Sequence, residues 1–260
     1  MSGGFELFSD ILARRDNWLS RRDARAKLGA ALAVLLAVLL SGRPHLPAVV
    51  CGLAFVATLW VGVPVRMAVV RLVLPLFSAA IIVTLKAILD GSTVLVQLDF
   101  QVFTLPVYRE GLAEGILIGS RVLGAVSVML LLSVVTPAHR IFAVLRWAGL
   151  PAAWTDTAML MYRYVFALLD HAATVYAAQR VRLGYSGLRS SLHCMGLLAG
   201  SVVNRSLGQA TRTYEALLTR GYTGKLPSAT MSAFRPADTV VLAVPVVLAW
   251  GAFVLLEYGL

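Results

Sequence analysis

The sequence predicts an all-α polytopic membrane protein with about five transmembrane helices, and three observations indicate this class. The 260-residue chain is 59% hydrophobic and has a mean hydropathy of +0.80. Only 14% of its residues are charged, whereas roughly a quarter are charged in a soluble domain. Several apolar runs approach the ~20 residues that a helix needs to cross a bilayer, and the alternating pattern of membrane strands is absent.

Five apolar segments are the predicted spans, and the third is interrupted by Arg71 and Pro75: residues 28–42, 47–64, 68–89, 111–136 and 239–257. Lys and Arg concentrate in cytoplasmic loops, and here they concentrate before the first span and within residues 137–236. We therefore expect a cytoplasmic N-terminus and an external C-terminus. The regions are an N-terminal cytoplasmic segment (1–27), four spans (28–136), a cytoplasmic helical region (137–236) and a final span (237–260).

The cytoplasmic region carries eleven basic and three acidic residues, which is +8 of the net charge of +10. Such an excess predicts an acidic partner, either anionic lipid headgroups or an acidic protein surface. Nucleic acid is not expected, because no basic and aromatic residues interleave and no nucleic-acid-binding motif is present.

Two long amphipathic helices are predicted in this region, over residues 153–182 and 190–220. The second carries an apolar stripe: Leu192, Met195, Ala199, Val203, Leu207, Ala210, Tyr214 and Leu217. It also has a ridge of small residues, which lets another helix approach closely: Gly196, Gly200, Asn204 and Gly208. A similar ridge opens the fourth span: Gly111, Gly115 and Gly119. For both ridges we expect packing within the chain, with homodimerisation as the alternative.

The two predicted helices end alike, because residues 180–187 read RVRLGYSG and residues 218–224 read LTRGYTG. Glycine after a helix commonly forms a left-handed cap, and arginine in the last turn interacts favourably with the helix dipole. Two similar ends on one basic region also suit a partner with two similar halves. The planar guanidinium of arginine can hold a carboxylate or terminal carbonyls in paired hydrogen bonds. Capping and docking both remain open interpretations of these ends.

At these ends the chain resembles the T component of energy-coupling-factor (ECF) transporters, most closely the CbiQ type of cobalt and nickel importers. Residues 23–28 (DARAKL) and 160–170 (LMYRYVFALLD), and the order of spans and insert, extend the resemblance over most of the chain. The family carries two Ala-Arg-Gly-like motifs that enter grooves of two ATPase subunits. The resemblance implies the docking residues Arg180, Arg182, Gly184, Arg220 and Gly221.

Departures from the family pattern leave one choice open. Residues 181–183 read Val-Arg-Leu and residues 219–221 read Thr-Arg-Gly. Aligning the shared Gly-Tyr places Arg220 opposite Leu183, so that either Arg180 or Arg182 can fill the first role.

The resemblance implies a non-catalytic coupling subunit of an ATP-driven importer, which carries cobalt rather than nickel across a bacterial or archaeal cytoplasmic membrane. Its implied partners are two copies of a CbiO-like ABC-type ATPase that bind Mg-ATP, a CbiM-like substrate-binding membrane subunit and a small CbiN-like accessory subunit. The chain itself has no complete phosphate-binding loop, since Gly224-Lys225 is followed by Leu226, so we expect no ATP hydrolysis and no cofactor. Its four histidines are scattered, so we expect no metal site.

Four ionisable residues fall inside the predicted spans: Arg71, Lys86, Glu114 and Arg121. Such residues are costly against lipid, so we expect them near an interface or facing protein. Glu114 and Arg121 lie two helical turns apart on one face, which predicts an ion pair between them. The alternative function is a self-contained secondary transporter or channel in which Lys86, Glu114 and Arg121 are pathway charges, but no inverted repeat supports it.

Overall fold

The computed structural model describes residues 22–91, 93–100, 103–224 and 236–258. The predicted regions 1–27 and 137–236 therefore lie partly outside the described residues, over 1–21 and 225–235. The described chain divides into two compact units, which we call the core unit, up to Ile141 and again from Pro236, and the arm unit, from Phe142 to Gly224.

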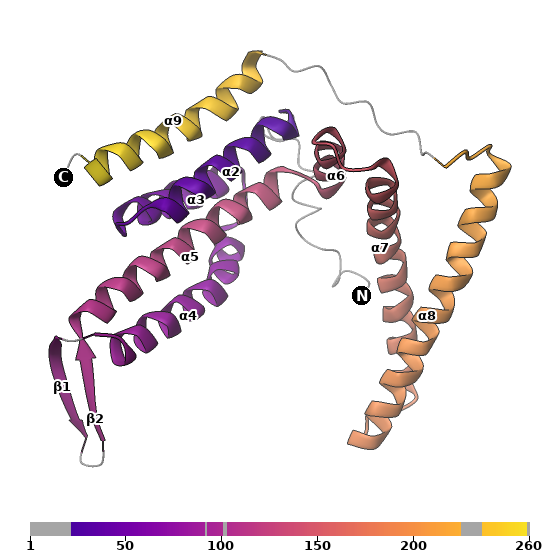
Figure 1. The fold of residues 1–260 in the computed structure, drawn as a ribbon. Helices are drawn as coiled ribbons and strands as arrows, with labels where there is room; N and C mark the ends of the chain where they lie inside the picture. The colour runs from indigo at the N-terminus through magenta and orange to yellow at the C-terminus, as the bar shows by residue number, and fades with distance from the viewer. Residues whose placement is uncertain (1–21, 92, 101–102, 225–235, 259–260) are drawn as a thin grey trace. The chain divides into compact units, whose positions relative to one another are not determined.

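The core unit contains a helix at each of the five predicted spans: α2 (Ala24–Leu40), α3 (His45–Trp60), α4 (Val65–Leu89), α5 (Arg109–Val135) and α9 (Pro236–Tyr258). Figure 1 shows α2 and α3 alongside α5, with α9 against α2 and α3 and with α4 following α5 on another side. Arg71 and Pro75, which interrupt the apolar run of the third predicted span, both lie within α4, and the helix is continuous through them. Among the described helices, α4 and α5 are long and apolar enough to cross a bilayer, and the apolar stretches 45–60 and 242–256 are shorter.

Small residues fill the interior of the core unit, and large apolar residues cover its surface. The buried residues of α4 are Ala68, Ala79 and Ala87, whereas Leu74 and Phe77 are 76% and 63% exposed. One buried cluster joins α2, α3, α5 and α9: Val34, Ala37, Val38, Leu46, Val50, Ala54, Val128 and Ala249. This arrangement is typical of helices that pack through small residues and face lipid with large ones.

A β-hairpin, which was not predicted, joins α4 to α5. Its strands β1 (Val94–Phe100) and β2 (Phe103–Tyr108) pair antiparallel, where the sequence between the spans was interpreted as a loop. The strands are rich in Val, Phe and Tyr, which favour β-structure, but seven and six residues between two strong helical signals give a weak pattern. The all-α prediction thus holds for the eight helices of the described residues and omits this hairpin.

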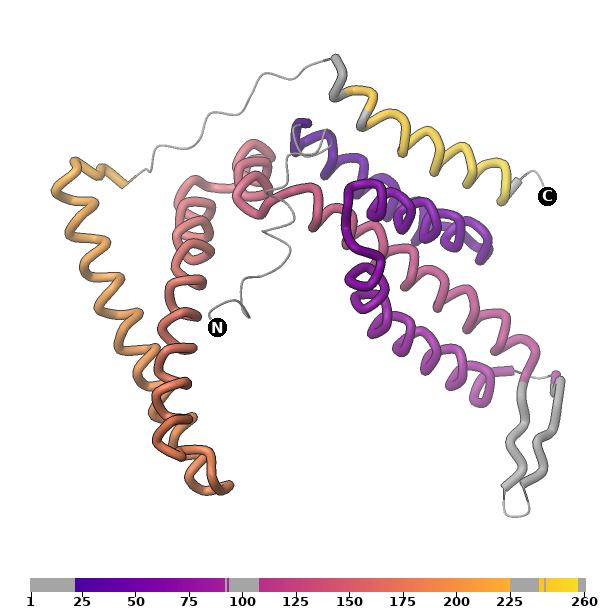
Figure 2. The backbone as a smooth tube through the Cα atoms, turned by 180° about the vertical axis from the view of Figure 1, so that it is seen from behind, coloured from indigo at the N-terminus to yellow at the C-terminus, as the bar shows by residue number. Residues whose placement is uncertain are grey.

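Three helices form the arm side of the chain: α6 (Ala138–Trp147), which begins in the core unit, α7 (Ala152–Val181) and α8 (Leu188–Thr219). The sequence predicted α7 and α8 to within two residues and missed the short α6. The elbow between α6 and α7 is held by an Arg146–Asp156 ion pair of 3.0 Å and by the edge-to-face rings of Phe142 and Tyr162, 6.1 Å apart. Figures 1 and 2 both show α7 and α8 approaching at their connection and separating towards their other ends.

Candidate docking site at two helix ends

Helix α7 ends in a hydrogen-bonded turn built around Arg182. Arg182 closes the helix with φ −84° and ψ 15°, and Leu183 follows in the left-handed region with φ 57°. The Leu183 amide donates to the Arg180 carbonyl at 3.1 Å, and the Gly184 amide donates to the Gln179 carbonyl at 2.9 Å. These two bonds define the Schellman motif, which satisfies the last carbonyls of a helix.

Helix α8 ends in the same motif around Arg220. Arg220 has φ −92° and ψ 10°, and Gly221 follows with φ 76°. The Gly221 amide donates to the Leu218 carbonyl and the Tyr222 amide to the Leu217 carbonyl, both at 3.0 Å. Glycine is the usual residue at this left-handed position, because it has no Cβ to clash with the backbone.

Superposing the two motifs pairs Arg182 with Arg220 and Leu183 with Gly221. Aligning the Gly-Tyr repeat in the sequence would instead match Gly184 with Gly221, so the two alignments differ by one residue. Arg180, the alternative left open by the sequence, corresponds to Leu218 and has no equivalent arginine in α8. The geometry thus identifies Arg182 as the counterpart of Arg220, while their docking role stays a prediction.

Both motif arginines are available to an outside acceptor. Arg180, Arg182 and Arg220 are exposed, and none of their three side chains has a hydrogen bond or ion pair within the described residues. The capping of both helices is carried out by backbone amides, so it leaves the guanidinium groups unoccupied. Two free guanidinium groups in matching backbone frames can each bind a carboxylate or a set of carbonyl oxygens.

A set of side-chain hydrogen bonds, which the sequence did not reveal, fixes the connection beside Arg182. The Tyr185 hydroxyl donates to Gln179 Oε1 at 2.8 Å, and Gln179 Nε2 donates to the Cys194 carbonyl at 3.0 Å. A Cβ on Gly184 would lie 2.6 Å from Cys194 Sγ, so a larger residue there would force the Cys194 side chain or the helix end to shift. Burial, with Cys194 and Tyr176 nearby, raises the pKa of Tyr185, which keeps its hydroxyl a donor at neutral pH.

The apolar stripe predicted for α8 faces away from α7. Leu192, Val203 and Leu207 are 64%, 57% and 64% exposed. Smaller polar side chains face α7 instead, as the bond of 2.9 Å between the hydroxyls of Tyr164 and Thr213 illustrates. The arm unit therefore presents an apolar surface that its own helices do not cover.

The small-residue ridge of α8 is also uncovered. A Cβ built on Gly196 or Gly200 meets no atom of the described chain within 4 Å, and at Gly208 it meets only Arg212 of the same helix. Asn204 is exposed as well. The packing within the chain that we expected for this ridge is not observed among the described residues of the arm unit.

The ridge of α5 does pack within the chain, as predicted. A Cβ on Gly111 would overlap the carbonyl oxygens of Lys86 and Asp90, and one on Gly115 would lie 3.0 Å from Val83 Cα. The two glycines let the backbones of α4 and α5 meet directly.

The ionisable residues of the core unit have structural partners that differ from the prediction. Arg121 donates to the carbonyl of Ser41 at the C-terminal end of α2, with Nε at 3.1 Å, and does not pair with Glu114. Glu114 instead accepts from Lys86 Nζ at 3.1 Å. The predicted Glu114–Arg121 pair is wrong because residues seven apart lie ~10 Å apart along a helix, and each finds a nearer partner on another element. The three residues that the alternative function would use as pathway charges thus have hydrogen-bond partners within the chain.

No metal-binding cluster of three or more His, Cys, Asp or Glu residues is present in the part of the chain that the structure describes. The histidines of α7 and α8, His171 and His193, belong to no such group.

Comparison with known proteins places these features in a family. The chain is 29% identical over 211 residues to an uncharacterised protein of Methanocaldococcus jannaschii, covering 81% of this chain and 79% of that one. It is 26% identical over 211 residues, or 79% of the chain, to a putative fused cobalt transport protein CbiMQ of Methanocorpusculum labreanum, and spans 35% of its length. It is 34% identical over 95 residues to the cobalt transport protein CbiQ of Rhodobacter capsulatus, or 36% of this chain and 39% of that one.

The family model described as CbiQ, cobalt transport protein, matches residues 15–231, which include both helix-end motifs. The matched range covers α2 to α8 together with the two arginine-centred helix ends. The chain therefore belongs to the CbiQ cobalt transport protein family, the T component of ECF cobalt transporters.

Proposed function

We propose that this chain is the non-catalytic coupling subunit of an ATP-driven cobalt importer. In this role, motion of two cytoplasmic ABC-type ATPases passes through α7 and α8 to a separate substrate-binding membrane protein. The observation that carries the proposal is the pair of matching Schellman ends with exposed, unpartnered Arg182 and Arg220. A pair of equivalent ends suits a pair of equivalent ATPase subunits, each of which receives one arginine.

Long, continuous helices support transmission of motion. Helices α7 and α8 contain 30 and 32 residues, so each extends over roughly 45 Å. The Arg146–Asp156 ion pair connects one end of α7 to α6, and the Gln179–Tyr185 bond connects the other end to the segment that follows it. A force applied at Arg182 is therefore carried along α7 to the elbow with α6.

The uncovered face of α8 is the proposed surface for the substrate-binding subunit. Its exposed apolar residues and open glycine ridge suit an apolar helix that approaches closely. A relative is a putative fused CbiMQ protein, which supports a CbiM-like partner for this chain. Cobalt is the proposed substrate, because the matching family and its named relatives are cobalt transport proteins, and the ion would be bound by that partner.

The test is reconstitution of transport with the partner subunits. The tagged chain is co-expressed with its ATPases and substrate-binding subunit, and cobalt uptake and ATPase co-purification are measured. The double variant Arg182→Ala/Arg220→Ala is expected to insert normally into the membrane and to lose both cobalt uptake and co-purification of the ATPases. The variant Arg180→Ala is the matched control, since it removes one exposed arginine from the same turn and should retain both. Full uptake by the double variant would exclude the docking role.

A further inference from the structure

Arg71 is a half-buried cation in an apolar helix of the core unit, and its side chain has no acceptor among the described residues. Four others donate to groups of the chain: Lys27 to the carbonyl of Val135, Arg43 to that of Leu256, Arg121 to that of Ser41, and Lys86 to Asp90 and Glu114. The side chains of Arg66 and Arg109 also lack an acceptor within the described residues, but both are exposed and lie in the first turn of their helices. An arginine in an apolar helix requires an acceptor, and the described residues of the core unit supply none, so a group from outside that unit can fill this position.

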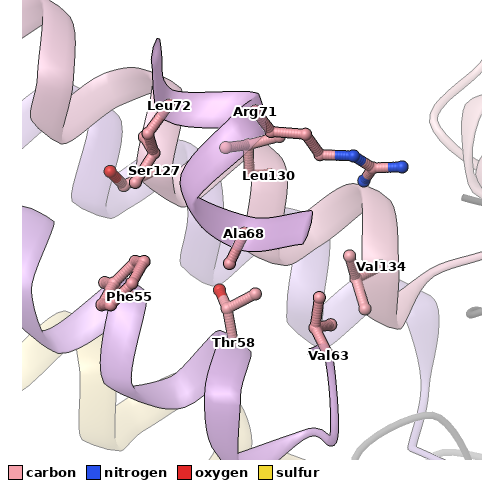
Figure 3. Close-up of a pocket in the computed structure, with 9 residues that line it drawn as sticks. All are labelled: Phe55, Thr58, Val63, Ala68, Arg71, Leu72, Ser127, Leu130 and Val134. Carbon is pink, nitrogen blue, oxygen red and sulfur yellow. The ribbon is translucent and has the colours of Figure 1, made fainter. Parts of the chain in front are cut away.

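The immediate surroundings of Arg71 offer no competing charge. Arg71 borders an apolar crevice between α3, α4 and α5, which is lined by Phe55, Thr58, Val63, Ala68, Leu72, Ser127, Leu130 and Val134. Figure 3 shows its guanidinium group directed away from the other labelled side chains. The hydroxyls of Thr58 and Ser127 donate to Ala54 and Leu123 of their own helices. The guanidinium group is therefore the polar feature that this surface presents to an incoming ligand.

The position of Arg71 along α4 brings it within reach of the phosphate layer of the membrane. It lies six residues, or ~9 Å, beyond Val65 at the predicted cytoplasmic end of α4. A long arginine side chain can extend from this depth to the headgroups. The adjacent Val70 and Leu74 are 63% and 76% exposed, as expected for a lipid-facing surface. Arg66, exposed in the first turn, adds positive charge on the same end of the helix.

We propose that Arg71 binds the phosphate of an anionic phospholipid from the cytoplasmic leaflet. The guanidinium fork holds two phosphate oxygens, and Arg66 favours a headgroup with net negative charge. The crevice has a volume of only about 10 Å³, which does not admit an acyl chain. The acyl chains therefore lie along the exposed apolar residues of α4, and the site selects for phosphate charge rather than for chain length. The site requires that α4 crosses the membrane and is independent of ATPase coupling.

The test is native mass spectrometry of the full-length chain, purified alone in mild detergent and titrated with phosphatidylglycerol or phosphatidylcholine. Wild type is expected to bind one phosphatidylglycerol more tightly than it binds phosphatidylcholine. Arg71→Met keeps an unbranched side chain suited to lipid. It should weaken the binding of phosphatidylglycerol roughly tenfold and abolish the preference over phosphatidylcholine. Arg71→Lys should retain part of the preference for phosphatidylglycerol. Arg66→Met is the control in the same helix and should lose less phosphatidylglycerol affinity than Arg71→Met.

Two results would overturn the proposal. One is equal phosphatidylglycerol affinity of wild type and Arg71→Met. The other is unchanged lipid binding by Arg71→Met together with loss of a partner membrane subunit from native membranes, which would mean that a carboxylate of that subunit is the acceptor. If Arg71→Met elutes as an aggregate, Arg71→Gln, which keeps a polar side chain without charge, takes its place with the same expectations.

Discussion

The two glycine ridges should respond oppositely to alanine. In α5, Gly111 and Gly115 lie against the backbone of α4, where an added Cβ would overlap carbonyl oxygens or approach Val83 Cα to 3.0 Å. In α8, Gly196 and Gly200 have open space where a Cβ would be added. The same substitution therefore tests whether a ridge packs within the chain or is exposed in the isolated chain.

The expected magnitudes follow from two opposing effects. Alanine stabilises a helix interior by ~1 kcal/mol relative to glycine, whereas overpacking costs ~1–3 kcal/mol. For Gly111→Ala the clash is with backbone that cannot rotate away, so we expect a net loss of ~2 kcal/mol. For Gly119→Ala the contact, at 3.3 Å, is with a Val83 methyl that can move, so the two effects nearly cancel. For Gly196→Ala and Gly200→Ala only the gain of ~1 kcal/mol remains.

The assay is the melting temperature of the purified chain in one detergent, where ~1 kcal/mol corresponds to a shift of ~2–4 °C in a protein of this size. Gly111→Ala should melt lowest, Gly119→Ala near wild type, and the two α8 variants above it. Wild-type melting of Gly111→Ala would refute the packing of α5 on α4. A fall in the melting temperature of Gly196→Ala equal to that of Gly111→Ala would show that the α8 ridge packs within the chain.

Three further substitutions test local features. Leu183→Gly should relieve a left-handed backbone strain of ~1 kcal/mol and slow amide exchange at the α7 end, and faster exchange would contradict the cap geometry. Arg121→Met should leave the Ser41 carbonyl without its donor, at a cost of ~1–3 kcal/mol in a thermal melt, and an unchanged melt would argue against that bond. Tyr185 has a raised pKa, so its bond to Gln179 should be intact at neutral pH and be lost only as pH rises through a value above 10. The measurement is a titration of tyrosinate absorbance, with Tyr185→Phe as the reference. Ionisation of Tyr185 at or below pH 10 would contradict the raised pKa.

Hydropathy and periodicity were sufficient to predict the main helices. The five apolar segments and the two long amphipathic helices correspond to α2–α5, α9, α7 and α8, because each carries a strong signal over many residues. The hairpin of residues 94–108 and the ten-residue α6 were missed, since short elements give weak patterns beside apolar runs. Arg71 and Pro75 interrupt the apolar run of the third segment, but α4 is continuous through both.

The pairing of side chains could not be predicted from spacing. Residues Glu114 and Arg121 share a helix face, yet their partners, Lys86 and Ser41, come from segments distant in sequence. The same limit applies to the helix ends: the Gly-Tyr repeat suggested one alignment, and the backbone φ angle of Leu183 established another. Tertiary approach and backbone conformation, rather than residue type, decided both outcomes.

The measurement that tests the central claim most directly is the affinity of the purified ATPase pair for this chain in nanodiscs. Wild type, Arg182→Ala, Arg220→Ala, the double variant and Arg180→Ala are compared at one salt concentration. If the two helix ends are equivalent docking elements, the first two variants should each weaken binding by a similar factor, roughly tenfold or more, and Arg180→Ala should change it little. Unchanged binding by the double variant, or a loss in Arg180→Ala equal to that in Arg182→Ala, would contradict the equivalence of Arg182 and Arg220.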